Sequence, residues 1–430
     1  MIFNRRDFIK GTAVLGTALL TKNAFSFTER FLTDHRFPVL QGATSFSKTQ
    51  INILAAEDIV VSVPLGKVSL TVVEKPYSIW KAYRVVVENL SPDTRYDLQI
   101  CSPDGVLLST RYFSTLTPDK TKAKIALISC TRDTKAEFQA PMWQALVDSN
   151  PDLIFLLGDN VYVDDETTEI HDPLSEVRLW RRYVETRLTL DLFHMPELIP
   201  TLATWDDHDY GLNNAYGETP YRVASTHVFK TLFAQDAIMP EVTWGPGVAV
   251  SFSAYGQRFY LMDSRSFRTE PLVGKEHWGS AQDEWMLGSL STSHQPGWIL
   301  SGSQIFGGYR EGWGFEKTHP ELLKKILSRL SKIEAPVLFG SGDVHYSEIM
   351  KIESELLGYE TFEITSSSMH SKASEPRDGN FRRLASTGEY NFVIAHVEVR
   401  DQSLIMDLHS HGRDNKQFFE VNNIRIGRSF

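Results

Sequence analysis

DLIFLLGDNVYVDD, residues 152–165, joins an apolar run to a series of polar side chains. The run from Leu153 to Leu157 has no polar position, which is typical of a strand that is buried on both faces of a sheet. Asp159 follows almost directly, and Tyr162 comes three residues after it. One polar residue after one strand is most often a turn former or a helix cap, so this segment alone leaves its role open.

Three further apolar runs also end in side chains that can bind a metal. They are KIALISC, with Cys130; TLATW, followed by Asp206, Asp207, His208 and Asp209; and PVLFGSGD, with Asp343 and then His345. From residue 124 onward, strand patterns alternate with helical patterns over 137–147 and 173–186, which indicates an α/β domain. Parallel strands place their carboxyl ends at one sheet edge, so we expect these groups to converge.

Such a cluster requires bound cations. About five carboxylates within roughly 4–6 Å of one another strongly disfavour each other's charge. Two ions that share one carboxylate, about 3.5–4 Å apart, would activate a water molecule and hold a phosphoryl group for in-line displacement. We expect Asp159 to be the shared carboxylate.

Composition and charge describe an ordinary globular protein. Its 430 residues exceed the roughly 100–200 of a single domain, so two folded units are expected. Hydrophobic residues make up 42% and charged residues 23%, which excludes a disordered or fibrous chain. The net charge of -10 argues against a nucleic-acid partner. Any phosphate substrate would need cations in the site that reverse this sign locally.

Residues 1–26 have the pattern of an export signal. Arg5 and Arg6 precede Phe8, and a small and apolar run extends from Gly11 to Leu20. The pair resembles the twin-arginine signal read by the machinery that exports folded proteins, which predicts a periplasmic or extracellular protein. About ten apolar residues fall short of the roughly 20 that span a bilayer, so no stable transmembrane span is expected. Two cysteines make no disulfide framework.

Residues 37–117 predict an all-β domain. Short alternating runs are separated by turn residues such as Pro92 and 104–105, a pattern typical of an antiparallel β-sandwich. The stretch NLSPDTRYDLQI resembles the Leu-x-Pro-x-Thr-x-Tyr corner of fibronectin type III domains, with Tyr96 as its tyrosine. A linker is expected at 117–120, followed by a catalytic domain over 122–430.

The order of motifs from Ile125 to Met369 resembles the alkaline phosphatase D family, a branch of the calcineurin-like metallophosphoesterases. The motifs are LISC, GDNVY, TLATWDDHDYGLNN, MDSRSFR, SGDVH and EITSSS. The resemblance implies a four-layer αββα catalytic domain and an exported metal-dependent phosphoesterase, in which a metal-bound hydroxide attacks a phosphate mono- or diester. A phosphodiesterase or phospholipase D-like enzyme with little monoesterase activity is the alternative, and a non-catalytic surface binding protein is a remote one.

The resemblance also implies a set of metal ligands. A ferric site would be made by Cys130, Asp159, Tyr162 and His345. A neighbouring calcium site would share Asp159 and add Asp207 and Asp343, with Asn213 or Asn214 close by. Thiolate and phenolate are anionic donors that favour a trivalent ion, whereas carboxylate and amide oxygens suit calcium. Zinc and manganese remain alternatives.

Three residues are expected to act on the substrate. His208 would protonate the departing alkoxide, with Asp209 as the acid that orients it. Arg132 and Arg265 would donate paired hydrogen bonds to phosphate, with a salt bridge between Arg265 and Asp263 as the alternative for that residue.

The remaining polar residues near the motifs are expected to matter less. His370 is a weak site candidate, Asn160 has no assigned role, and 164–165 are expected to be solvated loop acids. The natural substrate and the oligomeric state stay open.

Overall fold

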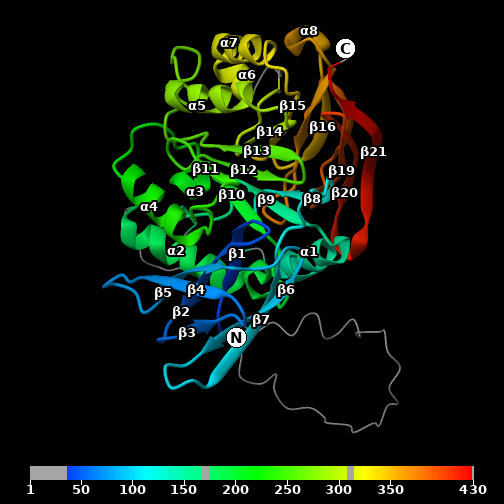
Figure 1. Ribbon diagram of the computed structural model, residues 1–430. Coiled ribbons are helices and arrows are strands. Elements are labelled where there is room, and N and C mark those ends of the chain that lie inside the picture. Colours follow the sequence, from blue (N-terminus) through cyan, green and yellow to red (C-terminus); the bar gives the residue numbers. More distant parts are fainter. Residues whose placement is uncertain (1–35, 135, 166–173, 308–313, 429–430) are drawn as a thin grey trace.

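The computed structural model describes residues 36–134, 136–165, 174–307 and 314–428 (Figure 1). Antiparallel strands occupy the N-terminal part, and strands and helices alternate after it. The predicted export signal, 1–26, lies outside the described residues. Within the described ranges, no helix combines the length and the apolar character needed to cross a membrane.

Two antiparallel sheets form the N-terminal part. One has the order β1-β2-β5-β4 and the other β3-β6-β7. Their bounds are β1 Val39–Thr44, β2 Thr49–Ala55, β3 Val60–Ser62, β4 Lys67–Val73, β5 Lys81–Glu88, β6 Arg95–Cys101 and β7 Leu107–Ser114. Buried side chains of both sheets, such as Val85 and Ile100, share one hydrophobic cluster. The hydroxyl of Tyr96 accepts a hydrogen bond of 2.7 Å from the backbone N–H of Ser91, which is the geometry of a tyrosine corner.

A six-stranded sheet contains the apolar run Leu153–Leu157 as its strand β9. Its order is β10-β9-β8-β19-β20-β21, in which β8, β9 and β10 run parallel and the other three strands are antiparallel. The bounds are β8 Lys122–Ile128, β9 Leu153–Leu157, β10 Thr201–Thr204, β19 Phe392–Arg400, β20 Ser403–His411 and β21 Gln417–Ile426. All five residues of β9 are buried, as its apolar sequence predicts.

An eight-stranded sheet packs against the six-stranded one. Its order is β11-β12-β13-β14-β15-β17-β16-β18, with β13, β14, β15 and β17 parallel. The bounds are β11 Val242–Trp244, β12 Val250–Ala254, β13 Gln257–Met262, β14 Gly297–Ser301, β15 Val337–Ser341, β16 Ser347–Ile352, β17 Thr361–Thr365 and β18 Arg383–Thr387. One cluster contains side chains of both sheets, and the rings of Phe155 and Phe259 lie 4.7 Å apart in it.

Helices flank the sheets. Buried side chains of three helices share a hydrophobic cluster with β8, β9 and β19: α1 Ala136–Ser149, α2 Glu176–Thr189 and α4 Arg222–Leu232. Two further helices, α5 Ser280–Ser291 and α7 Pro320–Leu330, contribute to the cluster that contains the eight-stranded sheet. The short helices are α3 Asp207–Tyr210, α6 Phe315–Thr318 and α8 Ser354–Leu357. The described ranges also contain two 3₁₀ turns, η2 Asp191–His194 and η3 Arg413–Asn415. The expected mixed α/β architecture with several sheets is confirmed.

The first N-terminal sheet supports the helix that follows the site. The side-chain amide of Asn52 in β2 donates to the carbonyl of Thr231 in α4 at 2.9 Å. Ser225 of α4 in turn donates to the carbonyl of Tyr210, the last residue of α3, at 2.6 Å. The β-rich part therefore helps to position α3, which begins at Asp207.

Candidate active site

The loops that carry the predicted ligands follow the carboxyl ends of β8, β9, β10 and β15. The predicted ligands that come within a few residues of a strand end include four with positive φ: Cys130 (57°), Asp159 (51°), Asp343 (71°) and His345 (63°). Residues other than glycine rarely adopt this backbone conformation. It persists only where the surrounding structure enforces it, which is common at functional sites. The chain turns sharply after each strand and directs these side chains to one place.

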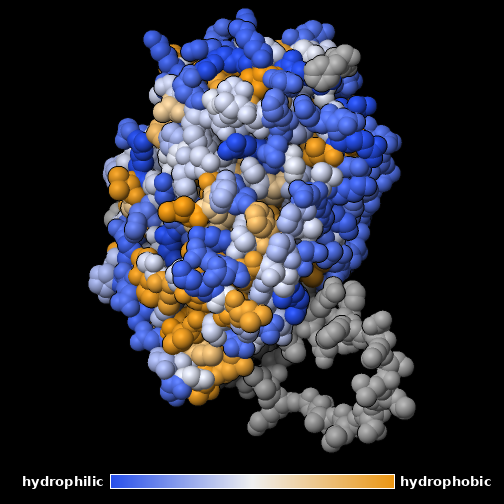
Figure 2. Space-filling model, in the orientation of Figure 1, coloured by the Kyte–Doolittle hydropathy of each residue, from blue (hydrophilic) through white to orange (hydrophobic). Residues whose placement is uncertain are grey.

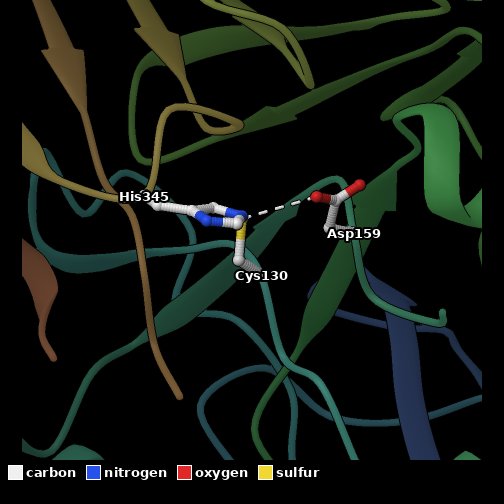
Figure 3. Close-up of side chains that lie close together, drawn as sticks. All are labelled: Cys130, Asp159 and His345. Atoms are coloured by element: carbon white, nitrogen blue, oxygen red, sulfur yellow. Dashed lines mark hydrogen bonds between the residues drawn. The ribbon is translucent and has the colours of Figure 1, made fainter. Parts of the chain in front are cut away.

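One group of potential ligands contains Cys130, Asp159 and His345, whose ligand atoms all lie within 4.8 Å of one another (Figure 3). The thiol of Cys130 lies 3.6 Å from the Asp159 carboxylate, and the hydroxyl of Tyr162 lies 3.4 Å from the same oxygen, Oδ2. Ser367 donates to the sulfur of Cys130 at 3.2 Å. Sulfur, nitrogen and oxygen donors thus surround one small volume.

Two more groups adjoin the first one. Asp159, Asp207 and His208 form one, and Asp206, Asp207 and Asp343 form the other, each within the same 4.8 Å. Asp159 therefore belongs both to the group with the thiol and to a group with Asp207, the position expected of a shared carboxylate. Asn214 is exposed, and its described contact with these groups is a hydrogen bond from its backbone N–H to Asp207.

Within the groups of potential ligands, two buried carboxylate oxygens accept no hydrogen bond from the described residues: Oδ1 of Asp159 and Oδ1 of Asp207. Burying a charged oxygen without a partner is costly, and a bound cation would remove that cost. Burial and the Asp206 and Asp207 carboxylates raise the pKa of Asp343 to about 7, and burial raises that of the Cys130 thiol. The donor set and its unmet charge therefore fit metal ions.

His208 is paired with an acid that the sequence did not single out. Its Nδ1 lies 2.7 Å from Oδ1 of Asp164, and its ring lies 4.3 Å from that of Tyr162. Burial favours the neutral ring, but Asp159 and the hydrogen bond to Asp164 outweigh it and raise the pKa of His208 to about 10.

The expectation that Asp209 orients His208 is wrong. The carboxylate of Asp209 instead accepts hydrogen bonds from the backbone N–H groups of Asn160 at 3.0 Å and Val161 at 2.9 Å. It also accepts from the backbone of Asp206, because it lies in the first turn of α3 and closes a capping box there. Asp164 is correspondingly no solvated loop acid.

Arg265 lies buried beneath the acids. Its guanidinium forms a two-pronged pair with Asp206, at 2.5 Å from Nε and 2.6 Å from Nη2, and Nη2 also lies 3.6 Å from Asp207. The alternative partner, Asp263, is wrong as an ion pair, because its side chain accepts from the indole of Trp205 at 2.7 Å and from the backbone of Arg265.

Arg132 lies at the rim of the site. Its guanidinium pairs with Asp165 and lies 5.3 Å from the centre of the Tyr162 ring, with about 35% of the side chain exposed. Asp165, like its neighbour, was expected to be solvated, and that expectation is wrong.

The side-chain amide of Asn160 donates to the carbonyl of Thr204 at 2.8 Å and ties the end of β9 to β10.

His370 lies outside the groups of potential ligands. Its Nδ1 is 3.1 Å from the backbone carbonyl of Arg132, and its ring packs edge-on against Trp143 at 5.8 Å. Its contacts therefore support the loop that carries Arg132.

A comparison with known protein families assigns the enzyme class, that of a phosphoric ester hydrolase. Residues 125–403 match the sequence model of the PhoD-like phosphatases, and the chain belongs to this family.

Solved structures extend the comparison to the fold. The structure titled "Structure of PhoD" aligns with a TM-score of 0.63 at 15% identity, covering 90% of this chain and 92% of that one. The structure "GAP50 the anchor in the inner membrane complex of Plasmodium" aligns with a TM-score of 0.44 at 12% identity, covering 71% and 89%. No curated protein matches.

Proposed function

We propose that this phosphoesterase is an exported, metal-dependent enzyme of the alkaline phosphatase type that hydrolyses phosphate mono- and diesters. The observation that carries the proposal is that one buried oxygen each of Asp159 and Asp207 accepts no hydrogen bond from the described residues, among thiol, imidazole and carboxylate donors. Cations bound at such a site would supply the positive charge that an acidic protein needs to bind a phosphoester.

Two cations divide the donors by chemistry in this proposal. Cys130, Asp159, Tyr162 and His345 would hold a ferric ion, and Asp159, Asp207 and Asp343 would hold a calcium ion, with the backbone N–H of Asn214 fixing Asp207. Ions bound by these residues would supply an activated water molecule and would neutralise charge on the phosphoryl oxygens. Zinc or manganese in either position would leave the reaction class unchanged.

The chain's own residues then hold and protonate the substrate. His208, hydrogen-bonded to Asp164, donates a proton to the departing alkoxide. Arg132, at the exposed rim, donates hydrogen bonds from its guanidinium group to a phosphoryl oxygen. Arg265 is a positioning residue, because its ion pair with Asp206 fixes the acids that face the substrate.

The domain division belongs to the same proposal. Residues 1–26 are a twin-arginine signal, 37–117 a β-sandwich, and 122–430 a catalytic domain in which two sheets lie between helical layers. The clusters shared by α1, α2 and α4 with the six-stranded sheet, and by α5 and α7 with the eight-stranded one, support the αββα order.

The substitution Asp159→Asn tests this function. It keeps the shape of the side chain and removes the charge, so we expect loss of bound metal, measured by elemental analysis, together with loss of hydrolysis of p-nitrophenyl phosphate and its bis ester. Asp119→Asn, an exposed acid outside the site, is the matched control. Full metal content and full hydrolysis in Asp159→Asn would contradict the proposal, and the ratio of mono- to diester rates decides the preferred substrate class.

A further inference from the structure

The strand β4 lies at an open edge of the N-terminal part. The sheet order β1-β2-β5-β4 places it last, so among the described strands it pairs with β5 on one side and with none on its outer side. A strand at such an edge presents a row of backbone N–H and C=O groups that can pair with a further strand. The outer side of β4 is therefore a candidate contact surface.

One face of β4 continues the hydrophobic core of the N-terminal part into solvent. Leu70 and Val72 are two residues apart and therefore point to the same face. Their partners across the register on β5, Val85 and Tyr83, are buried in the cluster shared by the two N-terminal sheets. Leu70 and Val72 are nevertheless each 40% exposed. The apolar face thus ends uncovered at β4.

Further apolar side chains flank this strand. Leu65, two positions before β4, is 94% exposed, and Ile79, in the loop from β4 to β5, is 71% exposed. The N-terminal sheets lie at the lower end of the molecule in Figure 1, and Figure 2, in the same orientation, shows hydrophobic residues gathered on the surface of that end. Contiguous apolar surface of this kind marks a contact with a partner.

Other edge strands are shielded in ways that β4 is not. The backbone N–H of Leu198 donates to the carbonyl of Tyr112 at 2.7 Å, so a chain segment covers the edge of β7. The strand β21 breaks its register with β20 at two places and carries Glu420 and Arg425. Charges, prolines and bulges of this kind prevent pairing at an edge. In contrast, β4 has an unbroken register with β5, no proline, and one charge, Lys67, at its first position.

The sequence of β4 is complementary to itself in one antiparallel register. Leu70 is the middle residue of the seven, so a two-fold axis at this position, perpendicular to the sheet, pairs the whole strand with that of a second copy. Lys67 then lies opposite Val73, and no like charges meet within the strands. Moving the axis to Thr71 would set Lys67 opposite Lys75, and like charges directly opposite each other are destabilising. A self-complementary surface of this kind is what a two-fold interface requires.

We propose that β4 is the contact of a symmetric dimer, in which it pairs antiparallel with β4 of a second copy around a two-fold axis at Leu70. The two N-terminal sheets then join into one continuous sheet. The open backbone groups of the edge form hydrogen bonds, and the apolar face with Leu70 and Val72 is covered by the same face of the second copy. The candidate active site lies in the other part of the chain, so each copy keeps its own activity.

Disulfide cross-linking tests this register directly. Residues directly opposite each other on antiparallel strands have Cα atoms about 4.5–5.5 Å apart, which a disulfide can bridge. In a Cys101→Ala background, which removes the less buried native thiol, Leu70→Cys should form a linked dimer under mild oxidation. Val72→Cys is the matched control, because it is equally exposed and on the same face. Its two copies would lie about 14 Å apart along the strands and should not link. Equal linking of both variants, or none in Leu70→Cys, would overturn the proposal.

Sedimentation velocity over a range of protein concentrations gives a second test. The wild type should dimerise, and Leu70→Lys, which sets two ammonium groups face to face at the axis, should raise the dissociation constant of the dimer at least about tenfold. Leu384→Lys, 50% exposed on the edge strand β18, should dimerise as the wild type does. Hydrolysis of p-nitrophenyl phosphate by dilute Leu70→Lys should match the wild type, which separates a lost contact from a lost fold. A wild type that stays monomeric, whether or not it binds anionic lipid vesicles, or unchanged dimerisation of Leu70→Lys, would contradict the dimer.

Discussion

The imidazole of His208 and the carboxylate of Asp164 lie 2.7 Å apart at the edge of the ligand cluster. Asp164 also accepts a hydrogen bond of 3.0 Å from the backbone N–H of Asn213, so a second loop holds the acid in place. Against the effect of burial, the charge of Asp159 and the hydrogen bond to Asp164 raise the pKa of His208. In the proposed mechanism, a proton at this position serves a leaving group that departs as an alkoxide.

The first prediction concerns this pair. His208→Gln should lower kcat by about 10²- to 10⁴-fold on an alkyl phosphate, because general acid catalysis is lost. Asp164→Asn should show a smaller loss of the same kind. Steady-state rates on an alkyl phosphate and on p-nitrophenyl phosphate measure it, since p-nitrophenolate departs without a proton. Equal losses on both esters would mean that His208 has another role.

The second prediction uses the two cysteines. Cys130→Ala should lose metal from the thiol-containing group and lose most activity, because the thiolate is its anionic sulfur donor. Elemental analysis and the visible spectrum of the purified protein measure this. Cys101→Ala, in β6, is the matched control and should retain both. Equal metal content in the two variants would remove Cys130 from the ligand set.

The third prediction concerns the buried pair of Arg265 and Asp206. Arg265→Met leaves a buried carboxylate without its partner, which should cost about 3–5 kcal/mol in the free energy of unfolding. The exposed pair of Arg329 and Glu284 is the control, because Arg329→Met should cost no more than about 1 kcal/mol. Urea denaturation measures both, and similar costs for the two variants would contradict the structural role of Arg265.

The fourth prediction concerns acid stability. His277 is fully buried and stacks on Phe315 at 3.8 Å, and burial followed by the nearby Arg268 holds its pKa well below 6.5. Between pH 6.5 and the lower folded pKa, the unfolded chain binds a proton that the folded chain does not. The free energy of unfolding should therefore fall with falling pH, by about 1.4 kcal/mol per pH unit for one such group.

Replacing the ring isolates this contribution. His277→Phe keeps a stacked ring and removes the titration, so its stability should fall less steeply below pH 6.5 than that of the wild type. Denaturant unfolding across pH 7 to 5 gives the slopes, and His294→Phe should keep the wild-type slope because that residue is exposed. A wild-type slope in His277→Phe would show that the acid sensitivity arises elsewhere.

Much of the fold was accessible from the sequence pattern. The uninterrupted apolar run of β9 predicts a strand buried on both faces, and the change from alternating strands to mixed elements near residue 120 predicts the change in architecture. The positions of Cys130, Asp159 and Asp343 after such strands predict their convergence, and the structure places them in adjoining groups of potential ligands. The expectation of a single sheet edge is wrong, because β8 and β9 belong to the six-stranded sheet and β15 to the eight-stranded one. Local periodicity suffices for the buried strands, whereas the packing of the two sheets brings their ends together.

The pairings around the ligands were not accessible in the same way. Asp209 is next to His208 in sequence, yet helix geometry turns its carboxylate to the backbone of β9's loop, at 3.0 Å from the N–H of Asn160. Asp164, 44 residues away from His208, reaches the imidazole instead. The partner of a hydrogen bond depends on the direction of the side chain, and two residues that are adjacent in the sequence can point their side chains in different directions.

The sequence by itself thus determined the buried strands, the family and the residue types that end each strand, because these depend on local pattern and order. Only the tertiary structure decided which acid serves which cation or ring: Asp206 for Arg265, Asp164 for His208 and Asp165 for Arg132. Such contacts join residues far apart in the chain, and their geometry exists only once the sheets have packed.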